Sequence, residues 1–340
     1  MISYKSSGVN IDLADMLIGR LKVKLPVIGF FSGLFPLKLK GYREPLLVAS
    51  TDGVGTKLLV AHAMNRHKTI GIDLVAMVVN DLCVCGAKSL FFLDYFATGK
   101  LRLGQAEDIL EGIMAGCRQA DCPLIGGETA ELPGLYQKGH YDLAGFGVGI
   151  VDKRKIIDGK TVRKGDVFIG VSSNGLHSNG YSLARKVLLE KAKIPLKRKH
   201  PLLGESLGEA LLRPTLIYSP LALALIDKVP VKGMAHITGG GIPGNLNRIL
   251  PPGIDADIDA GAIMDSAPPV FHLIRKCGPV STEEMFRTFN MGVGYVVAVE
   301  KSHVKKVHIL CRKMGFVSRE IGHAVKGGAK VRLNFRNEGE

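Results

Sequence analysis

The stretch from Ile70 to Cys85 constrains the fold of this chain more than any other segment. Its sequence, IGIDLVAMVVNDLCVC, is apolar at most positions, and Gly86 directly after it is a residue type that commonly ends helices. A helix that is apolar on nearly all sides has to be buried between other elements of a folded protein. We therefore expect its two acids, Asp73 and Asp81, to face a functional site rather than bulk water.

Short apolar strands and helices alternate on both sides of this helix. In the first half the expected elements are a helix at 104–120 and strands at 46–50, 90–97, 123–125 and 144–151. We expect a turn at 51–53, directly after the first of these strands. In the second half they are strands at 167–171, 233–237, 294–299 and 330–335, and helices at 180–190, 205–212, 217–227 and 302–314. This mixture predicts an α/β (α+β) fold. A charged segment near 152–165 interrupts the apolar pattern, so we expect two domains, 1–155 and 156–340.

The composition argues against several classes of protein. Residues 1–12 lack the apolar region of a secretory signal, and no apolar run approaches the ~20 residues that a membrane span needs. The six cysteines include no C-x-x-C pair, which favours reduced thiols in a cytoplasmic protein. The net charge of +14 favours contact with phosphates, but it is not concentrated in one segment. Without a nucleic-acid-binding motif beside it, we do not expect nucleic acid to be a partner.

The common nucleotide-binding motifs are absent. A P-loop ending at Gly159-Lys160-Thr161 would require glycine at position 154, where this chain has arginine. The glycines at 145, 147 and 149 lack the spacing of a dinucleotide fingerprint. A phosphate site in this chain must therefore be built in another way.

Three acids in distinctive contexts suggest a cation site: Asp52 in TDGVGTK, Asp81 in the apolar helix, and Glu128 in GGETAELPG. Two carboxylates ~5 Å apart repel by roughly 3 kcal/mol at an effective dielectric constant near 20, so a cluster of three would need a cation. Oxygen ligands near phosphate favour Mg²⁺. Alternatively, the acids cap helices or pair with nearby cations such as Lys57, and the sequence leaves both interpretations open.

Two loops of the second half combine small polar residues with glycine: SSNGLHSNGY at 172–181 and AHITGGG at 235–241. Each follows a strand and precedes an expected helix, where free backbone N–H groups can bind an anion. His177 in the first loop is a candidate general acid or base near neutral pH. The alternative is a histidine that only hydrogen-bonds its own loop.

Taken in order, these segments resemble the aminoimidazole ribonucleotide synthetases, or phosphoribosylformylglycinamidine cyclo-ligases. The resemblance extends from Ser3 to about Val299. The matching segments are SYKSSGVNID, YREPLLVASTDGVGTKL, HKTIGIDLVAMVVNDLCVCGAKSLFFLDYFATGKL, LIGGETAELPG, YDLAGFGVGIVDK, VSSNGLHSNGYSLARK, AHITGGG and MFRTFNMGVGYVVAV.

The resemblance implies a fold, an assembly and a reaction. The fold is a two-domain aminoimidazole ribonucleotide synthetase-like fold, in which the N-terminal sheets of two subunits pair across a homodimer. The N-terminal domain is then the ATP- and Mg²⁺-binding and dimerisation domain, and the C-terminal domain contributes the substrate site. The reaction is ATP-dependent cyclisation of formylglycinamidine ribonucleotide to aminoimidazole ribonucleotide, with release of ADP and phosphate.

The resemblance also assigns roles to individual residues. Asp52, Asp81 and Glu128 are expected to hold Mg²⁺ on the phosphates of ATP. Lys57, His177 and Asn179 are the expected catalytic residues, with Lys57 neutralising phosphate charge. The other nucleotide contacts are expected from Lys22, Gly53, Gly55, Gly127 and Thr129, and the substrate contacts, which include the ribose phosphate, from Ser178, Thr238, Gly239 and Gly240.

The chain departs from the family pattern at two places. The loop at 25–39 is shorter and more apolar than is usual after the family's lysine, and Ser6 and Asn10 stand where aspartates are usual. The alternatives within the superfamily are selenophosphate synthetase, thiamine-monophosphate kinase and the hydrogenase-maturation dehydratase. An alternative of another class is a nucleotide-binding regulatory or RNA-associated protein that uses the +14 charge.

Overall fold

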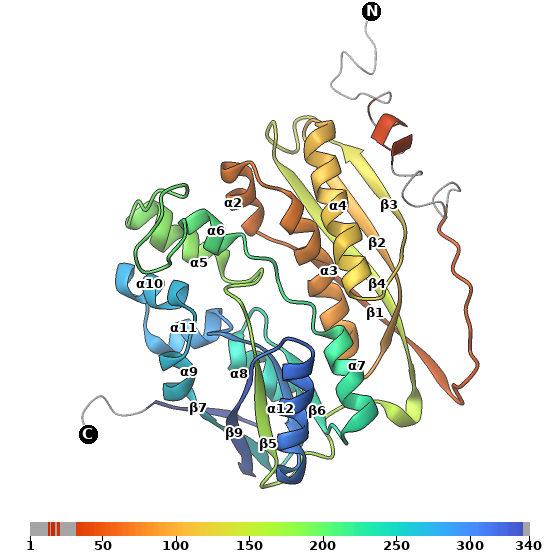
Figure 1. The fold of residues 1–340 in the computed structure, drawn as a ribbon, viewed down its shortest axis with the longest axis vertical. Helices are drawn as coiled ribbons and strands as arrows, with labels where there is room; N and C mark the ends of the chain where they lie inside the picture. The colour runs from red at the N-terminus through yellow and green to blue at the C-terminus, as the bar shows by residue number, and fades with distance from the viewer. Residues whose placement is uncertain (1–12, 14, 18, 21–31, 336–340) are drawn as a thin grey trace, which may run out of the picture. The chain divides into compact units, whose positions relative to one another are not determined.

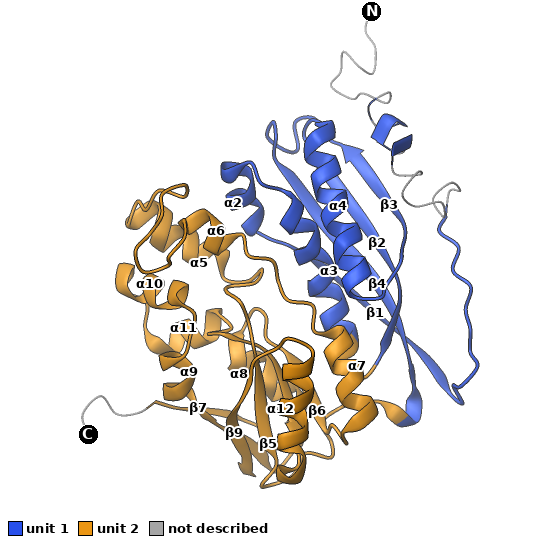
Figure 2. Cartoon of the chain, in the orientation of Figure 1, with its two compact units in different colours: residues 1–82, 87–154 blue, residues 83–86, 155–340 orange. Residues whose placement is uncertain are grey.

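The computed structural model describes residues 13, 15–17, 19–20 and 32–335 (Figure 1). It divides into two compact units (Figure 2). Unit 1 comprises 1–82 and 87–154, and unit 2 comprises 83–86 and 155–340. Within the described residues, no helix is both long enough and apolar enough to cross a membrane.

Unit 1 is a four-stranded sheet in the order β1-β4-β2-β3, with helices on one face (Figure 1). Only β2 and β3 are parallel neighbours. The strands are β1 (Pro45–Gly53), β2 (Lys88–Thr98), β3 (Leu124–Glu131) and β4 (Tyr141–Asp152), and the helices are α2 (Lys57–Met64), α3 (Lys68–Cys83) and α4 (Leu103–Gln119). The apolar helix expected at 70–85 is α3, and its side chains from Leu74 to Val79 are almost completely buried.

Glycines on β4 allow α3 to lie close to the sheet. A Cβ at Gly145 would stand 2.5 Å from the Phe92 ring, and one at Gly147 would stand 2.6 Å from Val78. Both distances are shorter than real Cβ atoms tolerate. The glycine-rich run on β4 therefore serves the packing of a helix on a sheet.

Unit 2 is built on a six-stranded sheet in the order β10-β7-β9-β5-β8-β6. Its strands are β5 (Val167–Ser172), β6 (Gly233–His236), β7 (Ile254–Asp259), β8 (Val293–Val299), β9 (Ser318–Lys326) and β10 (Val331–Asn334). Its helices are α5 (Tyr181–Arg185), which continues as a π-helical turn at Lys186–Lys191, α6 (Leu207–Leu211), α7 (Ser219–Lys228), α8 (Gly241–Leu246), α9 (Ala260–Asp265), α10 (Pro269–Cys277), α11 (Thr282–Thr288) and α12 (Val304–Lys313). Side chains of α7 and α12 pack with β5 and β8 in one apolar core.

The segment 83–86 belongs to unit 2 although the chain around it belongs to unit 1. Cys83 is completely buried in the apolar core of unit 2, where its Sγ lies 3.3 Å from the Tyr295 hydroxyl. The backbone N–H of Ile157 donates to the Cys85 carbonyl at 3.1 Å. Residues 83–86 therefore form part of the packed structure of unit 2.

Two of the expected boundaries are wrong in a way that affects the site. Residues 51–53 continue β1 instead of forming a turn, because they pair with 144–146 of β4. The strand expected at 123–125 extends to Glu131, because it pairs with β2. Asp52 and Glu128 therefore lie on strands, where pleating fixes the face to which each side chain points.

Candidate functional site

The register of the four-stranded sheet places the conspicuous residues of unit 1 in one row. Asp52 pairs with Gly145, Gly145 with Asp94, and Asp94 with Gly127. Residues in one row point to the same face, and Gly145 contacts Leu74 of α3, so Asp52 points to the helix-covered face. Its Oδ1 accepts a hydrogen bond from the Gly53 N–H at 2.7 Å. Gly55, two residues on, has a positive φ of 70° and is exposed.

Glu128 points to the opposite face, because it follows Gly127 in the same strand. Three strand spacings separate β1 from β3, which is ~14 Å at the usual 4.7–4.9 Å per spacing. Asp52 and Glu128 of one chain therefore cannot ligate the same ion. Among the described residues no group of three His, Cys, Asp or Glu side chains is arranged to hold a metal. The expectation that Asp52, Asp81 and Glu128 hold Mg²⁺ on the phosphates of ATP stays a prediction, and Asp52 and Glu128 can contribute to one ion only if they come from different chains.

Lys57 is completely buried and lies 2.8 Å from a carboxylate oxygen of Asp73, which is also completely buried. Burial lowers the pKa of the Lys57 ammonium group, and the charge of Asp73 opposes this shift. The ion pair ties the start of α2 to α3. The structure thus supports, for Asp73, the interpretation that an acid of α3 pairs with a nearby cation. Asp81, further along α3, is only half-buried.

Asp94 is a buried acid that the sequence did not single out. It lies on β2 between Gly145 and Gly127, and a Cβ at Gly127 would collide with its carboxylate. Burial raises the pKa of Asp94 to about 7. A carboxyl group that can hold its proton near neutral pH therefore lies in the same row as Asp52.

This shift predicts a pH dependence of stability. The folded state keeps the Asp94 proton up to about pH 7, whereas the unfolded chain releases it near pH 4. The contribution of Asp94 to the free energy of unfolding is therefore fully present below about pH 4 and decreases as the pH rises to about 7. Urea unfolding of wild type and Asp94→Asn is measured between about pH 4 and pH 8. The free energy of unfolding of Asp94→Asn should increase relative to that of wild type as the pH rises across this window. A constant difference would contradict the prediction.

The loop at 172–181 of unit 2, the histidine loop, contacts side chains of the segment just before α7. His177 is 2% exposed and has a positive φ of 62°, an uncommon conformation for a residue other than glycine. Its ring lies 6.1 Å from that of Tyr218. The Ser178 hydroxyl lies 2.9 Å from that of Thr215. The conformation of this loop is therefore imposed by its surroundings.

The histidine loop contacts residues 238–241, the TGGG loop. The Gly239 N–H donates to Oδ1 of Asn179 at 3.0 Å. The structure thus brings together Asn179 and the expected phosphate-binding loop within unit 2. Gly53, Gly127, Thr129, Thr238 and Gly240 are all at least partly accessible. Lys22, Ser6 and Asn10 lie outside the described residues.

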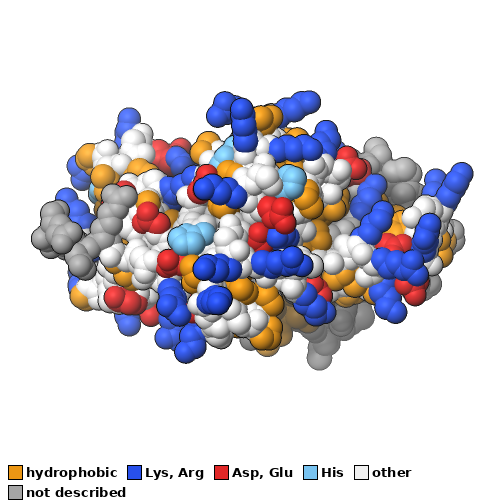
Figure 3. Space-filling view, turned by 90° about the horizontal axis from the view of Figure 1, so that it is seen from below, with side chains coloured by type: hydrophobic (Ala, Val, Ile, Leu, Met, Phe, Trp, Pro, Cys, Tyr) orange, Lys and Arg blue, Asp and Glu red, His pale blue; other side chains and the backbone are white. Residues whose placement is uncertain are grey.

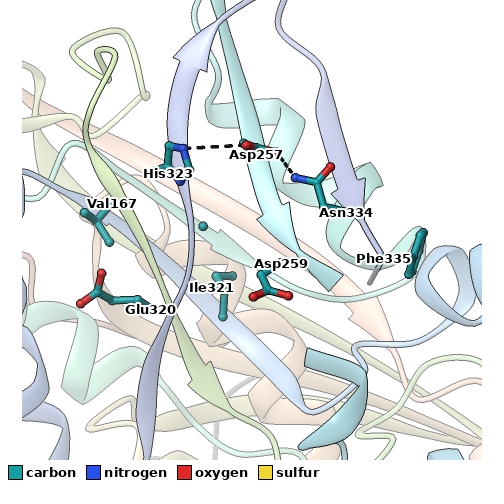
Figure 4. A pocket seen from close by; sticks show the side chains of 9 residues that line it. Val167, Asp257, Asp259, Glu320, Ile321, His323, Asn334 and Phe335 are labelled. Carbon is teal, nitrogen blue, oxygen red and sulfur yellow. Dashed lines mark hydrogen bonds and ion pairs between the residues drawn. The ribbon is translucent and has the colours of Figure 1, made fainter. Parts of the chain in front are cut away.

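A cavity of about 490 Å³ in unit 2 contains none of the expected site residues (Figure 4). It opens beside β7, β9 and β10, and its charged lining is mainly acidic, with Asp257, Asp259, Glu320 and His323. Carboxylates repel phosphate, so this cavity is unsuited to a nucleotide.

On the molecular face in Figure 3, Lys and Arg side chains are scattered among acids and apolar groups.

Comparisons with known proteins identify the two halves of the chain. Residues 40–151 match the N-terminal domain of the AIR synthase related proteins, and residues 163–334 match their C-terminal domain. A phosphoribosylformylglycinamidine cyclo-ligase of Thermodesulfovibrio yellowstonii is 52% identical over 336 residues, which cover 96% of this chain and 97% of that protein.

Solved structures with the same fold are much more distant in sequence. A thiamine-monophosphate kinase of Stenotrophomonas maltophilia has a TM-score of 0.65 at 19% identity, covering 95% of each chain. Hydrogenase maturation protein HypE in complex with ATP has a TM-score of 0.64 at 16% identity, covering 95% of this chain and 91% of that one. These two alternatives share the fold, but their sequences are far less similar to this chain than that of the cyclo-ligase.

Proposed function

The chain belongs to the phosphoribosylformylglycinamidine cyclo-ligase family, and on this premise we propose how its residues divide the work of the reaction. The chain is an ATP-dependent ligase of purine biosynthesis that converts formylglycinamidine ribonucleotide into aminoimidazole ribonucleotide, ADP and phosphate. The observation that carries this conclusion is 52% identity over nearly the full length of both proteins. We further propose a cytoplasmic location.

The proposed chemistry activates a poor leaving group. The formyl oxygen of the substrate attacks the γ-phosphorus of ATP, and ADP leaves. The neighbouring amidine nitrogen then attacks the formyl carbon, a C–N bond forms, and the C–O bond breaks as phosphate departs with the oxygen. In such a sequence the protein mainly positions the reactants and stabilises phosphate charge. We assign His177 to accept the proton that the attacking nitrogen loses, with Asn179 and Ser178 beside it.

The two units are proposed to bind different reactants. Unit 1 is assigned the nucleotide, through Lys22, Gly53, Gly55, Gly127 and Thr129 together with the three acids. Unit 2 is assigned the substrate, with its ribose phosphate at Thr238, Gly239 and Gly240. The complete burial of Lys57 favours a positioning role, in which its bond to Asp73 holds the TDGVGTK segment on α3.

The first experiment compares phosphate release from Mg-ATP with and without formylglycinamidine ribonucleotide, and follows the aminoimidazole product in parallel. Phosphate and product appearing together, and only with this substrate, is the expected result. ATP binding without turnover of this substrate would overturn the assignment of the reaction.

We propose that Mg²⁺ enters with ATP, where it neutralises phosphate charge. Asp52 on the helix-covered face and Asp81 on α3 are the acids assigned to contact it from one chain. Glu128 lies on the other face of the sheet and is assigned to the nucleotide through the proposed dimer.

Asp81→Asn is expected to fold normally, because the two side chains have the same shape, and to lower turnover of Mg-ATP by about 10- to 100-fold. Phosphate release at increasing Mg²⁺ concentration measures the effect. Asp121→Asn changes a highly exposed acid that follows α4 and provides the control. A well-folded Asp81→Asn protein with wild-type turnover would exclude the role in Mg-ATP use.

A homodimer is proposed from the face of the unit 1 sheet that lies opposite its helices. On this face Leu47 is 64% exposed, Tyr95 40% and Phe146 39%. The three side chains belong to adjacent strands and share one face by register. Exposed large apolar side chains on three neighbouring strands mark an interaction surface, and a second copy of the same sheet is the occupant that we propose.

Phe146→Lys is expected to convert the dimer into monomers, because a lysine on this face would have to lose its hydration when the two sheets pair. Sedimentation velocity at micromolar concentration measures the mass. Leu135→Lys changes a side chain that is 72% exposed outside the strands, and it should leave the mass unchanged. A wild-type protein that sediments as a monomer would disprove the dimer.

A further inference from the structure

The TGGG loop of unit 2 is organised around a single buried side chain, that of Asn245. This residue lies in α8 and is 3% exposed. Its Nδ2 donates to the carbonyl oxygens of Gly241 at 2.9 Å, Gly239 at 3.2 Å and Thr238 at 3.4 Å. Its Oδ1 lies 3.5 Å from the Thr238 hydroxyl. Three carbonyl groups of one short loop therefore converge on one amide.

This convergence determines where the N–H groups of the loop point. In a trans peptide the C=O and the following N–H are antiparallel. Because the carbonyls of Thr238 and Gly239 point inward to Asn245, the N–H groups of Gly239 and Gly240 point away from it. The Gly239 N–H confirms this direction, because it meets the side chain of Asn179 in the histidine loop at 3.0 Å.

We propose that Asn245 is a positioning residue for the phosphate of the substrate. By holding the carbonyls inward, it keeps carbonyl oxygens away from the anion, directs the Gly240 N–H outward, and directs the Gly239 N–H to Asn179, whose side chain it fixes beside the same loop. Asn245 itself is buried and does not touch the substrate. The inference rests on the proposed function, since it deepens the assignment of the ribose phosphate to Thr238, Gly239 and Gly240.

The test uses Asn245→Asp in the full-length enzyme. Aspartate has the same shape but replaces the donor with an acceptor, which repels the three carbonyls. The probes are formylglycinamidine ribonucleotide and the same compound without its phosphate. We expect KM for the ribonucleotide to rise about 10- to 100-fold with kcat within a few-fold of wild type. KM for ATP and kcat/KM for the dephosphorylated compound should not change. Asn247→Asp, an exposed position two residues further on, provides the matched control.

The outcomes separate positioning from general damage. An equal loss of kcat/KM for both compounds, or a loss confined to kcat, would overturn the proposal. If Asn245→Asp does not fold, Asn245→Ser, which keeps one donor, should raise KM for the ribonucleotide by a smaller factor. An unchanged KM in that folded variant would also overturn it. If wild type itself does not turn over the ribonucleotide, the proposed function fails independently of Asn245.

Discussion

Lys57→Met is expected to lower the free energy of unfolding by about 3–5 kcal/mol. Methionine retains most of the length and the apolar contacts of the lysine side chain but removes its charge. The Asp73 carboxylate, completely buried 2.8 Å from the lysine ammonium group, would lose that cation. A buried charge that loses its counter-ion is far more costly than an exposed one, because water cannot replace the missing partner. Urea denaturation at neutral pH measures the change.

Lys68→Met provides the matched control for this prediction. Lys68 forms an ion pair of similar length, 2.9 Å to Glu111, but its side chain is 64% exposed. Breaking an exposed pair should cost no more than about 1 kcal/mol. The double variant Lys57→Met with Asp73→Asn should recover part of the lost stability, since no buried charge remains. Equal effects of Lys57→Met and Lys68→Met would show that burial does not determine the strength of the Lys57 pair.

The fold could be predicted where local pattern and burial agree. The helix α3 was identified because it is apolar on nearly all sides, and it is the most deeply buried helix of unit 1. The strand β7 was missed because half of its sequence, IDADID, is aspartate, a residue type that is depleted in strands. The Asp255 carboxylate accepts hydrogen bonds from the backbone of Gly328 and Lys330 and from the Arg332 side chain. These partners lie more than seventy positions away, so no local signal predicts them.

The candidate site was also predicted only in part from the sequence. The motifs identified the segments that carry the chemistry, but not the faces to which their side chains point. Placing Asp52 and Glu128 on opposite faces requires the pairing of β1, β4, β2 and β3, which no single segment encodes. Asp94 and Asn245 were missed for a related reason. Each is an ordinary residue in its own segment, and its importance comes from the glycines and carbonyls that surround it.

Gly241→Ala is expected to lower the free energy of unfolding of unit 2 by more than about 4 kcal/mol, a loss that few single substitutions cause. Gly241 has a positive φ of 59°, which costs a residue with a Cβ roughly 1–2 kcal/mol. The larger contribution is steric. A Cβ at this position would stand far closer than 3.0 Å to the carbonyl oxygen of Phe286 in α11, and 3.0 Å from that of Phe289. Backbone atoms cannot rotate away as a side chain can, so α11 and the TGGG loop would have to separate.

Gly244→Ala, three residues further along α8, tests the same substitution without the collision. A Cβ at Gly244 would meet nothing within 4 Å, and its φ is not positive. Alanine in a helix should stabilise the protein by up to about 1 kcal/mol relative to glycine. Thermal unfolding of the two variants beside wild type therefore separates packing against α11 from the general effect of adding a methyl group. Wild-type stability in Gly241→Ala would mean that α11 can move away from the added methyl group at little cost. Packing against this helix would then not fix the conformation of the TGGG loop.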